Sequence, residues 1–228
     1  MIEAIGIEKR YGDRRVLDGV DLSLPRGAVT LLVGTNGAGK TTLLRIACGL
    51  CVPERGRLRV AGFDIVTQRL AALAHLAFFP QSPRFHLRLS CRQVARYYAE
   101  LRGLGPVSAE AALERWGLGS HLHATTAELS GGLRQRLALA VFSLAPVPVL
   151  VLDEPGLSLD PEWRARLQEY LSTAAGQGAT VLVATHLLGE WEGKTDQCVV
   201  LEAGRVGGFV APERLREQYN APERSALP

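Results

Sequence analysis

Lysine is scarce in this chain of 228 residues, where it occurs only at Lys9, Lys40 and Lys194. Arginine supplies most of the positive charge, yet the formal net charge is only +3. A balance this small gives no electrostatic basis for a nucleic-acid-binding surface, so no nucleic-acid partner is expected. Because lysine is so rare, Lys40, which lies in a glycine-rich loop, is less plausible as incidental surface charge.

Long apolar runs are also missing. The longest, Leu137 to Leu152, is interrupted by Pro146 and Pro148. It is shorter than the roughly 20 residues that span a bilayer, so it predicts a buried helix, a turn and a buried strand. Met1 to Gly12 carries four charged side chains and lacks the pattern of a signal peptide. We therefore expect a cytoplasmic protein.

Cysteine is limited to four residues, of which Cys48 and Cys51 form a C-x-x-C pair. Such a pair can mark a redox or metal site. Here it follows a core-facing helical stretch, and no second pair or histidine cluster follows it. The pattern favours buried structural thiols and no metal at this position.

The content of 47% hydrophobic and 21% charged residues predicts one compact domain. Early segments such as Val20 to Leu24 alternate apolar and polar residues, which indicates half-buried antiparallel strands. Ala28 to Val33 is continuously apolar and precedes a glycine-rich loop and a helical stretch, Thr41 to Leu50. Val147 to Leu152 and Ala179 to Ala184 resemble strands buried on both faces of a parallel sheet.

Residues 82–144 differ from their surroundings because they keep a helical periodicity with short glycine-rich breaks. They predict a helical subdomain inserted between residues 1–81 and residues 145–228, which form a β subdomain plus a catalytic core. The helix expected after Asp160 begins with an N-cap residue followed by Pro161. Strands alternating with a crossover helix predict an α/β core.

The first chemical motif is a G-x-x-x-x-G-K-[ST] loop between the predicted strand and helix. Its backbone N–H groups can turn toward phosphate oxygens, Lys40 can reach the β- and γ-phosphates, and Thr41 can ligate Mg²⁺. A glycine-rich turn beside a chance lysine is the alternative, and the flanking strand and helix argue against it. The loop residues are Gly34, Thr35, Asn36, Gly37, Ala38, Gly39, Lys40 and Thr41.

Two carboxylates, Asp153 and Glu154, follow the predicted strand Val147 to Leu152. Parallel strands bind ligands at their carboxyl ends, so Asp153 is suited to the Mg²⁺ shell and Glu154 to polarising an attacking water as general base. Surface acids at a strand exit are the alternative. A phosphate loop upstream argues for the functional interpretation.

A third motif, Leu-Ser-Gly-Gly from Leu129 to Gly132, opens the predicted helix that contains Leu137. Ser130 can be a plain N-cap. The same geometry exposes backbone N–H groups and a hydroxyl that can hold a γ-phosphate.

In their order, these three motifs are similar to those of the nucleotide-binding subunits of ATP-binding cassette (ABC) transporters. The resemblance implies a P-loop NTPase (RecA-like) core with an N-terminal antiparallel β subdomain and an inserted α-helical subdomain, and it implies ATP and Mg²⁺ as cofactors. It implies that Tyr11 stacks on adenine, that Gln81 senses magnesium and water, and that His186 contacts the γ-phosphate. Thr42 belongs to the implied ATP site. Ser130, Gly131, Gly132 and Gln135 would act on the ATP of a second subunit.

One loop departs from the family pattern, because Leu157 stands where a polar residue that communicates across the dimer is usual. Asp160 matches the family's dimer-coupling aspartate, yet it also fits an N-cap, and both roles stay open. Hydrolysis is expected to persist because Glu154 is present.

The resemblance implies a head-to-tail pair with a second copy or a similar subunit, and separate transmembrane permease subunits on the inner face of the cell membrane. Their helices would dock near Gln81 and around Phe85 to Tyr98. Four arginines in this region recur every fourth residue and could form a basic stripe toward a partner or lipid headgroups, but a solvated face is favoured because Ser90 interrupts the helix. They are Arg84, Arg88, Arg92 and Arg96.

The short chain most resembles the ATPases of ABC-2-type exporters, in particular those that serve haem export or copper-site maturation of nitrous oxide reductase. The alternative is a soluble ABC ATPase that acts on nucleic acid or ribosomes. Such proteins usually carry two cassettes or a long coiled-coil insertion, and this chain shows neither.

Overall fold

The computed structural model describes residues 1–144, 146–186, 188–191 and 193–211. Its strands are β1 (Ile2–Tyr11), β2 (Arg14–Leu24), β3 (Ala28–Val33), β4 (Arg55–Val60), β5 (Phe63–Asp64), β6 (Leu76–Phe79), β7 (Val149–Asp153), β8 (Thr180–Ala184), β9 (Gln197–Glu202) and β10 (Arg205–Val210). Its helices are α1 (Lys40–Ala47), α2 (Arg69–Ala74), α3 (Cys91–Leu101), α4 (Pro106–Arg115), α5 (Gly131–Phe142) and α6 (Pro161–Gly176), with short 3₁₀ turns at Gly119–His121 and Leu188–Trp191.

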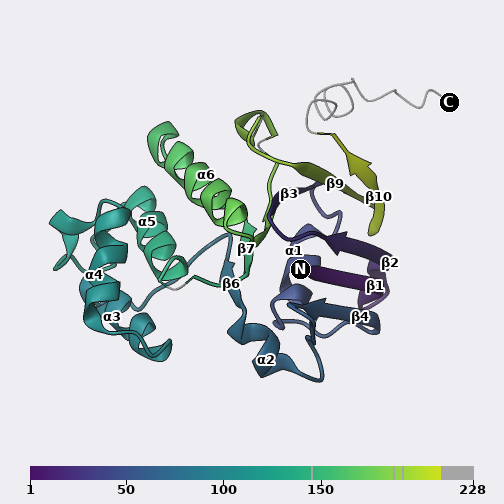
Figure 1. The fold of residues 1–228 in the computed structure, drawn as a ribbon, viewed down its shortest axis with the longest axis horizontal. Helices are drawn as coiled ribbons and strands as arrows, with labels where there is room; N and C mark the ends of the chain where they lie inside the picture. The colour runs from purple at the N-terminus through teal and green to yellow at the C-terminus, as the bar shows by residue number, and fades with distance from the viewer. Residues whose placement is uncertain (145, 187, 192, 212–228) are drawn as a thin grey trace.

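The strands form two sheets (Figure 1). One is antiparallel, in the order β2-β1-β4-β5. The other has the order β10-β9-β3-β8-β7-β6, and all its neighbours are parallel except β9 and β10. The alternating early segments are therefore antiparallel strands, and the continuous apolar runs are parallel ones, as predicted.

Each face of the parallel sheet is covered by its own core. Along β7, Val149 and Val151 pack into a cluster with α1 and the antiparallel sheet. Leu150 and Leu152 point into a second cluster with α5 and α6. Because successive side chains of a strand point to opposite faces, a strand between two apolar layers must be apolar throughout.

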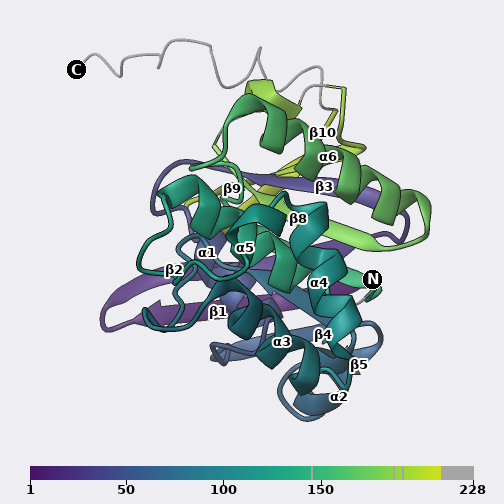
Figure 2. The ribbon, with the colours of Figure 1, turned by 90° about the vertical axis from the view of Figure 1, so that its left-hand side faces the viewer.

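Helices α3, α4 and α5 lie together (Figures 1 and 2), and Figure 1 shows them away from the antiparallel sheet. Ser90 caps α3, because its Oγ accepts from the N–H of Gln93 and the Gln93 side chain accepts from the N–H of Ser90. This reciprocal pair satisfies two N–H groups that a helix start leaves unpaired. All three helices fall within residues 82–144, which we call the helical segment.

The arginine series in this segment forms no continuous stripe. Arg84 and Arg88 precede α3 and lie in a loop. Arg92 and Arg96 lie on α3, and both form ion pairs with Glu110 of α4. The side chains of Arg92 and Arg96 are 33% and 47% exposed, so this face is solvated as expected, and Glu110 offsets part of its charge.

One aromatic side chain joins the helical segment to α6. The guanidinium of Arg136, on α5, lies 4.3 Å from the ring centroid of Trp163, and that of Arg166 lies 4.5 Å from it. Arg136 also donates to the carbonyl of Gly117 at 2.9 Å. Cations over an indole face are attracted by its quadrupole, so α5 and α6 are held together at this point.

Candidate nucleotide site

The predicted phosphate loop joins the end of β3 to the start of α1. Gly39 has φ = 108°, and a Cβ at this position would lie 2.8 Å from the carbonyl oxygen of Val16. A Cβ on Gly34 would clash with the carbonyl oxygen of Leu201. Both positions therefore require glycine, and the loop lies directly against β2 and β9.

Lys40, the first residue of α1, is 8% exposed. Its ammonium group donates to the carbonyls of Gly34 at 2.7 Å and Thr35 at 3.2 Å. A buried cation needs such partners, and here they keep the amine inside the loop. Positive charge and the N-terminus of α1 thus meet at one point, which suits a phosphate group.

Asp153 ends β7, and Glu154 follows it with φ = 47°, a left-handed conformation that is uncommon for a non-glycine residue. The N–H of Glu154 donates to the carbonyl of Ala184, the last residue of β8, at 2.9 Å. Burial raises the pKa of Asp153 and the charge of Glu154 adds to this effect, while a hydrogen bond from Thr41 and the charge of Lys40 oppose it. A backbone outlier beside a buried acid is typical of functional sites.

His186 follows β8 and contacts the second acid. Its Nδ1 lies 2.9 Å from Glu154 Oε1, and its backbone N–H donates to Glu154 Oε2 at 3.4 Å. The side chain of Glu154 is 9% exposed and that of His186 is 50% exposed. The acid is therefore fixed from two directions, while the imidazole keeps one open side.

Lys40, Asp153 and Glu154 line a cavity of about 310 Å³, whereas His186 reaches it only through its contact with Glu154. Most of the predicted site residues line it, and two that the sequence analysis missed do so as well, Arg14 and Val16. The residues lining the cavity are Tyr11, Arg14, Val16, Asn36, Gly37, Gly39, Lys40, Thr41, Thr42, Gln81, Asp153 and Glu154. Arg14 follows Tyr11 within the same β1–β2 turn, which is the one sequence signal that could have suggested it.

Three predicted magnesium ligands fall in this lining, namely Thr41, Gln81 and Asp153. They offer a hydroxyl, an amide oxygen and a carboxylate, which are the hard oxygen donors that Mg²⁺ prefers. Thr41 also makes a hydrogen bond with Asp153. The donor set therefore fits a magnesium ion.

Tyr11 lines the cavity and is 49% exposed, with the ammonium of Lys9 5.5 Å from its ring centroid, and its stacking on adenine stays a prediction. Its hydroxyl lies 3.5 Å from Cys51 Sγ. Cys51 is only half-buried, whereas Cys48 is buried and its burial raises the pKa of its thiol. Both are free thiols, and the expectation of buried cysteines is correct for Cys48 alone.

The Ser130–Gly132 segment lies at the start of α5, outside the cavity lining. Ser130 Oγ accepts from the N–H of Leu133 at 3.2 Å, so its N-cap role is real. Gln135 does not reach the surface: it is 4% exposed and its amide donates to the carbonyl of Pro155 at 3.1 Å. Within one chain Gln135 therefore holds the Asp153-Glu154-Pro155 loop, and its contact with the ATP of a second subunit stays a prediction.

Asp160 is the N-cap of α6, because its Oδ1 accepts from the N–H of Trp163 at 3.0 Å. Leu157, three residues earlier, is 45% exposed. A loop with an exposed leucine and a capped helix start is available to a partner, and the coupling role of Asp160 stays a prediction.

A glycine loop between a parallel strand and a helix, facing an acid pair at the end of a neighbouring strand, defines the class of P-loop nucleotide hydrolases. A family model described as "ABC transporter" matches residues 17–156. A second, described as "AAA domain, putative AbiEii toxin, Type IV TA system", matches only residues 125–190. The chain belongs to the ABC transporter family.

Curated relatives agree with this assignment. The chain is 40% identical over 205 residues to the daunorubicin resistance ATP-binding protein DrrA3 of Streptomyces coeruleorubidus, a match that covers 88% of this chain and 65% of the relative. It is 35% identical over 222 residues to the Nod factor export ATP-binding protein I of Paraburkholderia xenovorans, which covers 94% and 72%. The chain thus spans about two thirds of the length of these relatives.

Solved structures show the same fold. An ATP-binding subunit of an ABC transporter, 28% identical, superposes with a TM-score of 0.87 over 96% of this chain and 93% of that one. A dimeric bacterial ABC transporter cassette, 22% identical, gives 0.84 over 93% and 99%. Within the described ranges, no helix has both the length and the apolar character needed to cross a membrane.

Proposed function

We propose that the chain is the ATP-hydrolysing subunit of an ABC transporter. The observation that carries the proposal is the position of Glu154, which lines the phosphate-loop cavity and lies 2.9 Å from His186. A carboxylate fixed beside the phosphate site can accept the proton of an attacking water. The chain would thus bind ATP through the loop and cleave its terminal phosphate.

Each group has a definite task in this reaction. Lys40 stabilises negative charge on the transferred phosphoryl group, and His186 orients Glu154 and meets the γ-phosphate. The left-handed backbone at Glu154 keeps its carboxylate directed at the cavity. Mg²⁺, held by Thr41, Asp153 and Gln81, would neutralise the charge of the β- and γ-phosphates.

We also propose a head-to-tail pair, in which Ser130, Gly131 and Gly132 close over the nucleotide of a second copy or a similar subunit. Ser130 and Gly131 are exposed and lie outside their own cavity, so they are free to meet another one. In this proposal residues 82–144 act as the helical subdomain, and residues 1–81 and 145–228 act as the β subdomain plus catalytic core. Asp160 would couple the two sites.

Closure of the pair and ATP hydrolysis would drive separate transmembrane subunits from the inner face of the cell membrane. These subunits would then move their substrate out of the cell. Support comes from relatives that are named for Nod factor export and daunorubicin resistance. These names give no support to haem export or copper-site maturation. They refer to neither nucleic acid nor ribosomes, and the net charge of +3 also argues against that alternative.

Glu154→Gln tests the proposal, because it keeps the shape of the side chain and removes the base. We expect ATP binding to persist, phosphate release to fall by about 10²- to 10⁴-fold, and an ATP-dependent dimer to accumulate on size-exclusion chromatography. Glu100→Gln, an exposed acid on α3, is the control and should leave turnover unchanged. Normal phosphate release by Glu154→Gln would remove Glu154 from its role.

A further inference from the structure

A second cavity, of about 1000 Å³, lies far from the phosphate loop. Its wall includes Arg26, Val147 and Ala179, which lie one or two residues before the starts of β3, β7 and β8. The phosphate loop and the acid pair follow the opposite ends of these parallel strands, so the cavity opens at the other edge of the sheet. Its volume reaches the upper end of the range of small-molecule sites, about 300–1000 Å³.

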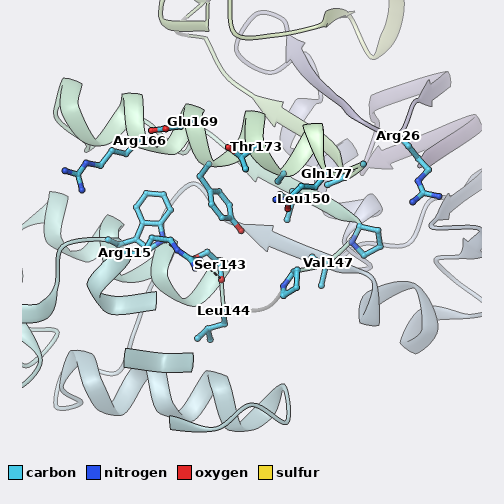
Figure 3. A pocket seen from close by; sticks show the side chains of 17 residues that line it. Arg26, Arg115, Ser143, Leu144, Val147, Leu150, Arg166, Glu169, Thr173 and Gln177 are labelled. Atoms are coloured by element: carbon cyan, nitrogen blue, oxygen red, sulfur yellow. Dashed lines mark hydrogen bonds between the residues drawn. The ribbon is translucent and has the colours of Figure 1, made fainter. Parts of the chain in front are cut away.

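The cavity lies between the helical segment and the core (Figure 3). Arg115, Ser143 and Leu144 line it from the ends of α4 and α5, and α6 forms the facing wall through residues such as Thr173 and Gln177 (Figure 3). The floor is apolar and includes Val147 and Leu150. A ligand in this cavity would touch both parts of the chain at once.

The charge of the lining is unbalanced, with three arginines and one glutamate. Arg166 pairs with Glu162 on its own helix at 3.0 Å. For Arg115 and Arg26 no carboxylate partner is found among the residues that the structure describes, and the guanidinium of Arg115 donates only to the carbonyl of Ser143, at 3.4 Å. The guanidinium of Arg115 is therefore available for an anion, and its planar fork suits a carboxylate.

Tyr170, on α6, brings a hydroxyl to the same end of the cavity. Its ring packs edge-on against Trp116, the neighbour of Arg115, with centroids 5.9 Å apart. Burial raises the pKa of the phenol and the charges of Arg115 and Arg102 oppose this effect, so the hydroxyl stays protonated and can donate. A cationic fork, a phenolic donor and an apolar trough are the parts of a site for an amphiphilic anion.

We propose that this cavity binds a small organic monocarboxylate with a hydrocarbon body. The carboxylate would bind Arg115 and the Tyr170 hydroxyl, and the hydrocarbon would lie along Leu144, Val147 and Leu150. The site is separate from the nucleotide cavity and shares no lining residue with it. The proposal does not depend on ATP hydrolysis, so the two can fail independently.

Calorimetric titration of the nucleotide-free protein with sodium octanoate tests the proposal, with octanol and octylammonium as probes of equal chain length. We expect saturable binding of octanoate alone. Arg115→Gln should weaken it by about 10- to 100-fold, the usual range for a charged hydrogen bond, and Tyr170→Phe should weaken it several-fold. Arg59→Gln, an exposed arginine of β4, is the matched control and should leave binding unchanged.

Circular dichroism and thermal unfolding first establish that each variant is folded. Ala174→Phe provides a second route, because it keeps Arg115 and Tyr170 but places a larger side chain in the cavity from α6, and it should abolish binding. The proposal is overturned if octanoate shows no saturable binding, if octanol binds equally well, or if folded Arg115→Gln and Ala174→Phe proteins bind octanoate like the wild type.

Discussion

The stack of Arg136, Trp163 and Arg166 allows a quantitative prediction about what holds the helical segment to the core. Trp163 is only 8% exposed, so its replacement by leucine should destabilise the fold measurably. Leucine keeps part of the buried apolar side chain, so the cost should lie below the about 3–5 kcal/mol typical of Trp→Ala. The informative quantity is the coupling energy of each arginine with the ring, obtained from a double-mutant cycle.

The two couplings should differ. Arg136 is partly buried, and a desolvated cation–π contact contributes up to about 2 kcal/mol. The side chain of Arg166 is 52% exposed and shares its charge with Glu162, so its contact should contribute about 0.5 kcal/mol. Arg136→Met and Arg166→Met, each combined with Trp163→Leu, would measure both values.

Urea unfolding of the four proteins in each cycle provides the free energies. The bond from Arg136 to the Gly117 carbonyl is lost in both Arg136 variants, so the cycle cancels it. None of the three residues lines the phosphate-loop cavity, so nucleotide affinity should not change in folded variants. A coupling near zero for Arg136, or one no larger than that of Arg166, would refute the reasoning.

Three further predictions concern the nucleotide cavity. Lys40→Ala should abolish binding of a fluorescent nucleotide, and retained affinity would contradict the loop assignment. Ser130→Arg should leave that binding intact but suppress phosphate release that depends on the dimer, and normal activity would exclude the shared site. Because burial raises the pKa of Asp153, its ionised form costs folding free energy at neutral pH. Asp153→Asn should therefore raise the urea midpoint at neutral pH and raise it less in acid, because the native carboxyl takes up its proton at a higher pH than the unfolded one. An equal shift at neutral and acid pH, or a larger one in acid, would count against this explanation.

Local signals predicted much of the fold. The apolar run at Ala28 to Val33 is β3 to the residue, and Ser130 and Asp160 are N-caps as expected. These features depend on backbone hydrogen bonding and on alternation within a few residues, which the sequence displays directly. The resemblance then indicated which residues share one cavity, including Tyr11 and Gln81.

What the sequence did not reveal depends on distant packing. The ion pairs of Arg92 and Arg96 exist because α4 brings Glu110 beside them. Only the packing of α5 shows that the amide of Gln135 is buried against Pro155 within the chain. Arg14 was missed because only the hairpin between β1 and β2 brings it to the phosphate loop.

The pairing of β3 has a consequence for how the protein is made. This strand ends at the phosphate loop, yet its neighbours are β8 and β9, so that Leu31 pairs with Val183 and Cys198. A ribosome that adds about 5–20 residues per second needs roughly 8–30 s to pass from Leu31 of β3 to Val183 of β8. During that interval β3, which leads into the loop, lacks both of its neighbours in the parallel sheet. We therefore expect nucleotide binding only after β8 and β9 have left the ribosome.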